Sequence, residues 1–550
     1  MLKTNKSKNL TGILLQLPVI ALAALAALKF IFAFVISLCD VKIFENYALE
    51  YVGFENYEAL FTRNMHIIYS LANTIVLLIL CSLLLALTAV LPALFISRLK
   101  TPFGIGVLAL YSVISLSVCM NGSWDYITAF IPESFELYTY AIALNLLALA
   151  PTFGVTYALA KAKSINYAST LGMVGASVFL TGAMLYTETI VINRPMTLLT
   201  QYYSYTNHTF DYGTANAALV VYFVILICTC AVFSLAALGL TALLRLIKLK
   251  EKPLNIISYI FFGLSLTNLV WLINPIATMF SSFKTENGFG IDNYRSLFIS
   301  LYCKIFGENI GWDGTVDYSV MSEFIGFVIT MLVIFALILP VFYLIFVFTT
   351  ASGLALIKDS KWKWLFLLPI PILVMFNNGI FLPNYLESNL GEIYPTWLNL
   401  IVASCDTFIS GVGMLLLLVL TYVILRKMLE KCENRKKRMI LGISSLAASC
   451  YSVFGMTLLW SPGMLRYWHY FLQDMLCNMY EIFKFGIGTF FDYEILDILG
   501  IDAFDITREV VFAGNTLLLL VSGALVIIPT ILLFLFSRSC KKDEPKEITE

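Results

Sequence analysis

Two polar side chains in apolar surroundings are the first candidates for chemistry in this chain. Asp406 lies in the segment IVASCDTFISGVGM, and Asn145 lies in AIALNLLALA. A charge in the middle of a membrane costs at least about 2.5–3.5 kcal/mol, so an ionisable residue there is a functional candidate by default. Asp406 would line a translocation path and bind sugar hydroxyls or a cation, or it would pair with a buried donor such as Asn145 or Asn399. Both interpretations stay open.

Motifs for catalysis are missing from the sequence. It has no Walker motif, no G-x-S-x-G and no H-E-x-x-H. His66, His208 and His469 stand alone, so no metal site is predicted. The 11 cysteines show no C-x-x-C spacing and are interpreted as small apolar residues. We expect no enzyme activity in this chain and no cofactor bound by it.

A short motif occurs twice. Residues 53–61 read GFENYEALF, and residues 290–298 read GIDNYRSLF. The shared positions are Gly53, Asn56, Tyr57, Leu60 and Phe61 in the first copy and Gly290, Asn293, Tyr294, Leu297 and Phe298 in the second. A repeat of such a long period indicates a chain built from two similar halves.

The composition places much of the chain in a membrane. Apolar residues make up 60% of it and charged residues only 13%, whereas a soluble domain has about 25% charged residues. The formal net charge is zero, so nothing points to nucleic acid as a partner. At roughly 20 apolar residues per span, the chain has room for about twelve helices.

Apolar segments divide evenly between the two halves. Helices are expected because the lipid interior cannot satisfy backbone polar groups. We therefore predict an all-α polytopic membrane protein of about twelve transmembrane helices, arranged as two parallel six-helix repeats in residues 1–250 and 251–550. The predicted spans are 11–38, 67–97, 104–120, 135–158, 168–190, 216–247, 256–281, 324–357, 363–383, 395–425, 440–461 and 509–537.

Basic residues predict the orientation. Lysine and arginine gather in alternate connections, such as 245–252 and 426–438, while acidic residues dominate 39–66 and 462–510. Because basic loops stay in the cytoplasm, both termini are expected there. Both copies of the motif then lie outside, and the two halves run in the same direction.

Two interpretations of the repeated motif are open. In the structural one, a short amphipathic segment lies on the membrane surface with Tyr57 and Phe61 at the interface, and Asn56 and Asn293 cap or bind a loop. In the other, the motif contacts a substrate. Aromatic residues clustered in the outer loops likewise fit either an interface belt or sugar-stacking faces: Tyr202, Tyr203, Tyr205, Trp468, Tyr470, Phe490 and Phe491.

The motif and several further residues resemble a known family. Those further residues are Asn73, Thr74, Ser282, Phe283, Lys284, Pro195, Thr200, Phe210, Tyr212, Gly213 and Ala217. The chain resembles the membrane subunits of bacterial carbohydrate-type ABC importers, the maltose-permease class, with both subunits fused. In that class the external segment after the first core helix reads similarly to G-L-x-N-Y-x-x-L-F.

The resemblance implies a fold, a location and partners. The fold would be that of a type I ABC importer permease in the bacterial cell membrane. The activity would be transport of a sugar or related small solute by alternating access between the two halves. ABC ATPase subunits, which would bring ATP, and an extracellular substrate-binding lipoprotein would be the partners, beside membrane lipid.

The cytoplasmic loops depart from that family. Its members carry an E-A-A…G…L-P signature where the loop docks on the ATPase, and neither 157–172 nor 425–442 has it. The candidate coupling residues in these loops are Lys161, Lys163, Glu430 and Arg435. One alternative is therefore a degenerate permease homologue without ATP coupling, acting in assembly or secretion. The other is an external membrane glycosyltransferase that uses Asp40 or Glu45.

Overall fold

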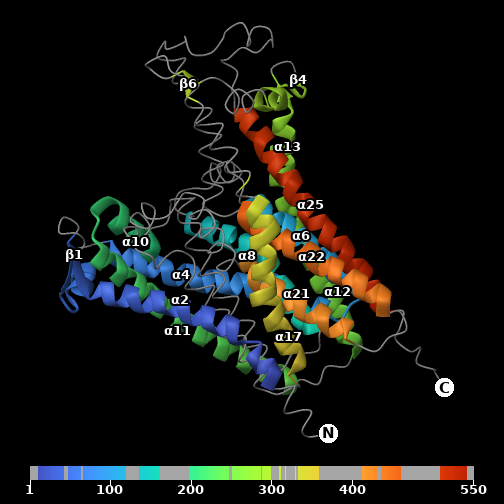
Figure 1. Ribbon diagram of the computed structural model, residues 1–550, viewed down its shortest axis with the longest axis horizontal. Coiled ribbons are helices and arrows are strands. Elements are labelled where there is room, and N and C mark those ends of the chain that lie inside the picture. The colour runs from blue at the N-terminus through green and yellow to red at the C-terminus, as the bar shows by residue number, and fades with distance from the viewer. Residues whose placement is uncertain are drawn as a thin grey trace.

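Helices dominate the computed structural model of the chain (Figure 1). The residues that it describes are 10–42, 48–62, 66–118, 136–161, 197–246, 251–285, 288–298, 309–310, 316–317, 329, 332–357, 412–429, 435–459 and 508–541.

Residues 1–250 form a series of long helices joined by short ones. Their bounds are α2 (Leu17–Ser37), α3 (Glu55–Thr62), α4 (Ile67–Leu85), η2 (Ala86–Val90), α5 (Leu91–Ile96), α6 (Thr101–Val118), α8 (Glu136–Lys161), α10 (Leu198–Ser204), η4 (Tyr205–Thr209) and α11 (Tyr212–Leu246). The segments η2 and η4 are π-helical, and α4, η2 and α5 form one continuous helix.

Residues 251–550 contain a second set of helices. Their bounds are α12 (Glu251–Thr267), η5 (Asn268–Leu272), α13 (Ile273–Ser282), η6 (Ile334–Ile338), α16 (Leu339–Phe342), η7 (Tyr343–Phe348), α17 (Thr349–Leu356), α21 (Val412–Met428), α22 (Arg435–Leu459) and α25 (Arg508–Lys541). The segment η5 is a 3-10 helix that joins α12 to α13, whereas η6 and η7 are π-helical.

Among the described residues, five stretches are long and apolar enough to cross a membrane, and they overlap predicted spans. They are Ile67–Ile96, Tyr212–Thr229, Pro253–Ser282, Ala336–Leu356 and Phe512–Cys540. Other predicted spans overlap the helices α2, α6, α8, α21 and α22. The predicted spans 168–190 and 363–383 lie outside the described residues. The described part is therefore that of a helical membrane protein.

In the part of the chain that the structure describes, three antiparallel hairpins add to the expected helices. They are β1 (Cys39–Lys42) with β2 (Ala48–Tyr51), β3 (Lys284–Thr285) with β4 (Gly288–Phe289), and β5 (Asn309–Ile310) with β6 (Val316–Asp317). The first two follow α2 and α13 directly, so each comes immediately before a copy of the repeated motif.

The centre of the molecule is the contact between α8 and α21 (Figure 1). Gly154 of α8 makes a close approach possible, because a Cβ at this position would lie 2.6 Å from Leu416 Cδ1. Buried side chains from residues 19–226 and 339–453 join in one apolar core around this contact. Packing thus links segments from both halves of the chain.

Two pairs of helices extend from this centre and end at the hairpins. The helix α2 packs along α11 and leads to β1, and α13 packs along α25 and leads to β4 (Figure 1). In each pair, the helix before a motif copy packs against the last long helix of the same half.

The first helical segment of each half also packs against the other half. Gly12 and Gly353 approach so closely that a Cβ on Gly353 would lie 2.6 Å from Gly12 O, and Gln16 Nε2 donates to Thr350 O at 3.0 Å. On the other side, Phe95 of α5 stacks on Phe261 of α12 with ring centroids 4.7 Å apart.

Candidate functional site

Asn56 ties the motif to the end of the preceding helix. Its side-chain amide donates both hydrogens, one to Ser37 O at 3.0 Å and one to Cys39 O at 2.8 Å. The last carbonyls of a helix have no partner within the helix. Asn56 therefore satisfies backbone acceptors at the point where α2 gives way to the hairpin.

Tyr57 adds a second tie to the same helix end. Its hydroxyl lies 2.7 Å from Ser37 Oγ, which in turn donates to Phe34 O at 2.6 Å. Burial raises the pKa of Tyr57, and the hydrogen bond to Ser37 opposes that rise only in part. Gly53 begins the motif with φ +65, a conformation that glycine adopts without strain.

The second copy makes the same hydrogen bonds. Asn293 Nδ2 donates to Ser282 O at 2.9 Å and to Lys284 O at 2.7 Å. The hydroxyls of Tyr294 and Ser282 are 2.7 Å apart, and Ser282 Oγ donates to Met279 O at 2.6 Å. We call this arrangement of one asparagine, one tyrosine and the serine at the helix end the staple. Each half has one.

The two motif helices also bury and expose the same positions. Leu60 and Leu297 are buried, with 0% and 1% of their surface exposed, while Phe61 and Phe298 are exposed. Leucine therefore anchors each short helix inward, and phenylalanine projects outward. This is the geometry of the structural interpretation, in which the asparagines bind a loop.

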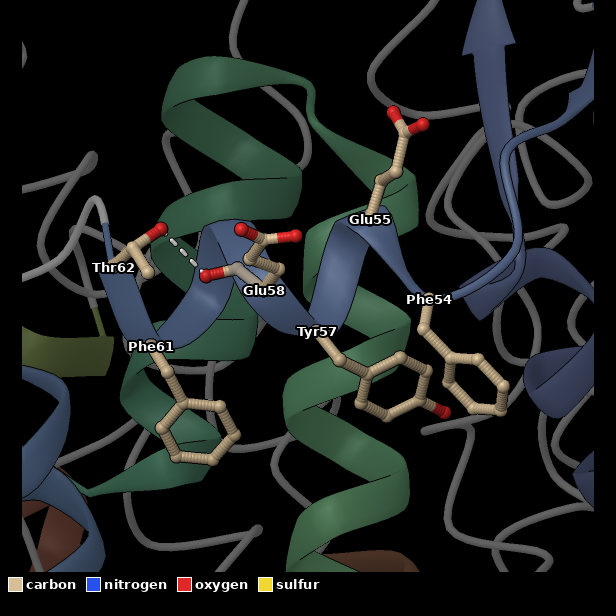
Figure 2. Close-up of a pocket in the computed structure, with 6 residues that line it drawn as sticks. All are labelled: Phe54, Glu55, Tyr57, Glu58, Phe61 and Thr62. Atoms are coloured by element: carbon tan, nitrogen blue, oxygen red, sulfur yellow. Dashed lines mark hydrogen bonds between the residues drawn. The ribbon is translucent and has the colours of Figure 1, made fainter.

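The outward side of α3 borders an open depression of about 510 Å³. Figure 2 shows the rings of Phe54, Tyr57 and Phe61 on one side of the helix and the carboxylates of Glu55 and Glu58 on another. Thr62 Oγ1 donates to Glu58 O at 2.7 Å. The depression is shallow, and the rings lie at the spacing of one helical face, as expected for an amphipathic helix at a surface.

The segment at 197–213 docks onto the first staple. Tyr212 joins Ile36 and Val41 in a small buried cluster. Gly213 lies against Asn56, because a Cβ there would be 2.6 Å from Asn56 Nδ2. Two of the residues that carry the family resemblance thus lie at the motif that carries it most strongly.

The same segment is also bonded to α4. Thr74 Oγ1 accepts a hydrogen bond from Leu198 N at 3.0 Å, and Gln201 Nε2 donates to Ser70 Oγ at 3.2 Å. Thr197 and Thr200 form a reciprocal cap at the start of α10. Pro195, which also carried the resemblance, lies outside the described residues.

Asn145 belongs to a buried chain of polar groups. Its Oδ1 lies 3.2 Å from Thr88 Oγ1. The carbonyl of Thr88 accepts from Tyr111 at 3.0 Å, and Tyr111 Oη accepts from Asn268 Nδ2 at 3.4 Å. The chain runs from α8 through η2 and α6 to η5, so it joins the two halves near the middle of predicted spans. Asp406 lies outside the described residues.

Of the four candidate coupling residues, the structure describes Lys161 and Arg435, and both lie at helix ends. Lys161 Nζ, at the end of α8, donates to Ser97 O at 2.9 Å and to Leu99 O at 2.8 Å. Arg435 is exposed at the start of α22. Lys163 and Glu430 lie outside the described residues.

The second of these loops is a helical hairpin. The helix α21 runs to Met428 and α22 begins at Arg435, and the two helices pack against each other. Arg438 Nη1 donates to Lys427 O at 3.4 Å, and Gly442 lies against the Met428 side chain. Six residues, 429–434, connect them, which is less than two helical turns.

Among the described residues, no three His, Cys, Asp or Glu side chains come together as a metal site. Asp40 is exposed on β1, opposite Glu50 in the hairpin register, and Glu45 lies outside the described part. The candidate site residues that the structure describes thus mainly bond to backbone groups and connect neighbouring helices.

Sequence reasoning missed Ser37, which completes the first staple, and singled out Ser282, which completes the second, only through the family resemblance. Ser37 and Ser282 each end a long apolar helix and are each followed by a large apolar residue, Leu38 or Phe283. A serine followed by a large apolar residue at the end of an apolar run, upstream of each motif copy, is the sequence pattern that could have identified these serines. In comparisons with known proteins, no family model, no curated protein and no solved structure matches this chain.

Proposed function

We propose that this protein is a membrane permease of the carbohydrate ABC-importer kind, with both transmembrane subunits fused into one chain. The observation that carries the proposal is the pair of staples, Asn56–Ser37 and Asn293–Ser282, which have the same hydrogen bonds in both halves. An asparagine, a tyrosine and a serine in one arrangement at two distant places support a duplicated unit.

The helix packing around the staples supports the same proposal. Each half pairs its first and last long helices, α2 with α11 and α13 with α25. Each half also places its first helical segment on the other half, at Gly12–Gly353 and at Phe95–Phe261. These exchanged contacts suit two halves that move against each other around a common centre.

The proposed transport cycle assigns roles to the two ends of the molecule. Both staples face outside, where a substrate-binding lipoprotein delivers a sugar or related small solute. The polar chain from Asn145 to Asn268 lies close to the middle of the membrane, the depth at which transporters of repeated construction hold solutes. ATPase subunits dock on the opposite side and supply the energy of ATP hydrolysis.

Affinity purification tests the proposal. The full chain, tagged at its C-terminus, is extracted in mild detergent without nucleotide, with ATP and with ATP plus vanadate. We expect an ATPase chain to co-purify in at least one of these states and to be missing from an untagged control. Recovery of intact chain without any ATPase in all three states would contradict ATP coupling.

The α21–α22 hairpin favours a second candidate, a permease homologue that has lost ATP coupling. Only residues 429–434 connect the two packed helices, which leaves little length for a separate docking helix. Reversing the exposed charges of Arg435, Lys436 and Lys437 to glutamate separates the candidates. A coupled permease would lose its ATPase, whereas an uncoupled homologue has none to lose.

A further inference from the structure

A proline follows a π-helical segment at one place in each half. In the first half, η2 ends at Val90 and Leu91-Pro92 follow. In the second half, η6 ends at Ile338 and Leu339-Pro340 follow. Each π segment has five residues and each is followed at once by the same Leu-Pro pair. The segment η2 lies within Ile67–Ile96, and η6 overlaps the start of Ala336–Leu356; both stretches are long enough to cross a membrane.

The chemistry of proline favours a widened turn before Pro92 and before Pro340. Proline has no backbone N–H, and its ring clashes with the carbonyl four residues earlier. Those carbonyls belong to Thr88 and Ala336. Widening the preceding turn to the i→i−5 pattern removes the clash, and Leu91 N–H indeed bonds to Ala86 O. Such widened turns are frequent at functional sites in helices.

A proline inside a helix does not by itself produce this arrangement. Pro151 lies within α8 and Pro529 within α25, and both helices continue as α-helix through the proline. The widened turns before Pro92 and Pro340 therefore depend on their surroundings as well as on the proline ring.

The carbonyl of Thr88 cannot accept a helical hydrogen bond from position 92, because proline has no N–H, and it accepts one from a side chain instead. Tyr111 donates its hydroxyl to Thr88 O at 3.0 Å. Tyr111 is fully buried, and its ring packs edge-on against Phe153 with centroids 5.1 Å apart. Asn268 of the second half donates to the same hydroxyl at 3.4 Å. One tyrosine thus connects the widened turn of the first half to η5 of the second.

The helix beyond each proline is the part that contacts the other half. After Pro92, α5 carries Phe95, which stacks on Phe261 of α12. After Pro340, α17 carries Gly353, which meets Gly12. A change of bend at either proline would therefore move the first helical segment of the opposite half.

We infer that the widened turns at 86–90 and 334–338 are a matched pair of hinges, and that Tyr111 is the latch that holds the first hinge bent. These hinges would move the helices in the same way whatever the transported solute or the energy source. Bending at one hinge shifts the helix end that contacts the other half, at Phe95 or at Gly353, so the two halves change conformation together.

Hydrogen exchange of the full chain in lipid nanodiscs tests the hinges. We compare Pro92→Ala, Pro340→Ala and, as a control, Pro102→Ala, since Pro102 occupies the first turn of α6 and has no helical bond to block. We expect amides 86–91 to exchange at least about tenfold more slowly in Pro92→Ala, and amides 334–339 likewise in Pro340→Ala, because the normal helical bonds return. Pro102→Ala should leave both segments unchanged. Unchanged exchange in both hinge variants would overturn the inference.

The latch has its own test in the same assay. Tyr111→Phe keeps the ring against Phe153 but removes the donor to Thr88 O. We expect amides 86–91 to exchange faster, by about threefold or more, in the native background. In the Pro92→Ala background they should be unaffected, because the restored backbone N–H at position 92 takes over that carbonyl. An equal effect in both backgrounds, or none in either, would exclude a latch.

Discussion

Gly213 lies directly against the side chain of Asn56. A Cβ on Gly213 would come within 2.6 Å of both Asn56 Nδ2 and Cys39 O. The start of α11 therefore rests on the staple, and the staple in turn fixes the end of α2. The contact of α11 with two segments that are distant from it in the sequence therefore depends on the absence of a side chain at Gly213.

The first prediction concerns this contact. Gly213→Ala should destabilise the protein by about 1–3 kcal/mol, the usual cost of overpacking a filled site. Gly106→Ala is the control, because a Cβ there meets nothing within 4 Å, and it should be neutral or slightly stabilising. Thermal unfolding in detergent, followed by tryptophan fluorescence, measures both. A Gly213→Ala variant as stable as the control would contradict the close contact.

The second prediction concerns the two staple asparagines. Asn56→Ala and Asn293→Ala should each cost about 1–3 kcal/mol, because two carbonyls lose their donor. Asn56→Asp and Asn293→Asp should cost more, since a carboxylate has no hydrogen to donate and repels those carbonyl oxygens. The same unfolding assay checks the order, with exposed Glu58→Gln as a control within about 0.5 kcal/mol. Opposite orders in the two copies would show that the staples are not equivalent.

The third prediction concerns the contact of Thr74 with α10. Thr74→Val keeps the shape but leaves Leu198 N–H without its acceptor in a buried place, which should cost about 1–3 kcal/mol. Thr74→Ser retains the hydroxyl and should lose less than half as much. Ser82→Ala is a matched control, because Ser82 Oγ donates only to Leu78 O of its own helix. Limited proteolysis of 197–213 should rise in Thr74→Val alone.

The fourth prediction concerns the pH dependence of the first hairpin. Lys42 Nζ lies 2.5 Å from Glu50 Oε2, and this hydrogen bond and charge lower the pKa of Glu50. The ion pair therefore contributes fully above the ordinary glutamate pKa of about 4.3 and is lost as the pH falls through the lower folded value. Hydrogen exchange of residues 39–51, corrected for intrinsic rates, should speed up below that range. In Glu50→Gln the corrected rate should not change with pH.

Much of the helical structure and part of the site followed from residue patterns. The apolar runs predicted helices that the described residues contain, since a helix alone satisfies its own backbone in lipid. The repeated Asn-Tyr pair lies at both staples. Tyr212 and Gly213 were noticed only through family resemblance, and their position against the first motif is a tertiary contact that no local pattern encodes.

Other features could not be predicted for physical reasons. The hairpins at 39–51 and 284–289 are too short for an alternating pattern, and in each of them a staple asparagine donates to a backbone carbonyl. Proline in an apolar run indicates a disturbed helix but not its form. Pro92 and Pro151 differ in outcome because of their neighbours, although the repeated Leu-Pro pair could have drawn attention to 91–92 and 339–340.

The proposed permease function depends most on two equivalent halves that run in the same direction. Exposed Glu58 and Arg295 occupy matching positions in the two motif copies, and exposed Lys100 lies in a predicted cytoplasmic turn. Each is replaced by cysteine, one at a time, in a chain without native cysteines. Intact cells are then treated with a maleimide that cannot cross the membrane. We predict labelling of Glu58→Cys and Arg295→Cys in intact cells and of Lys100→Cys only after permeabilisation. Labelling of one motif copy and protection of the other would place the copies on opposite sides and contradict the parallel repeat.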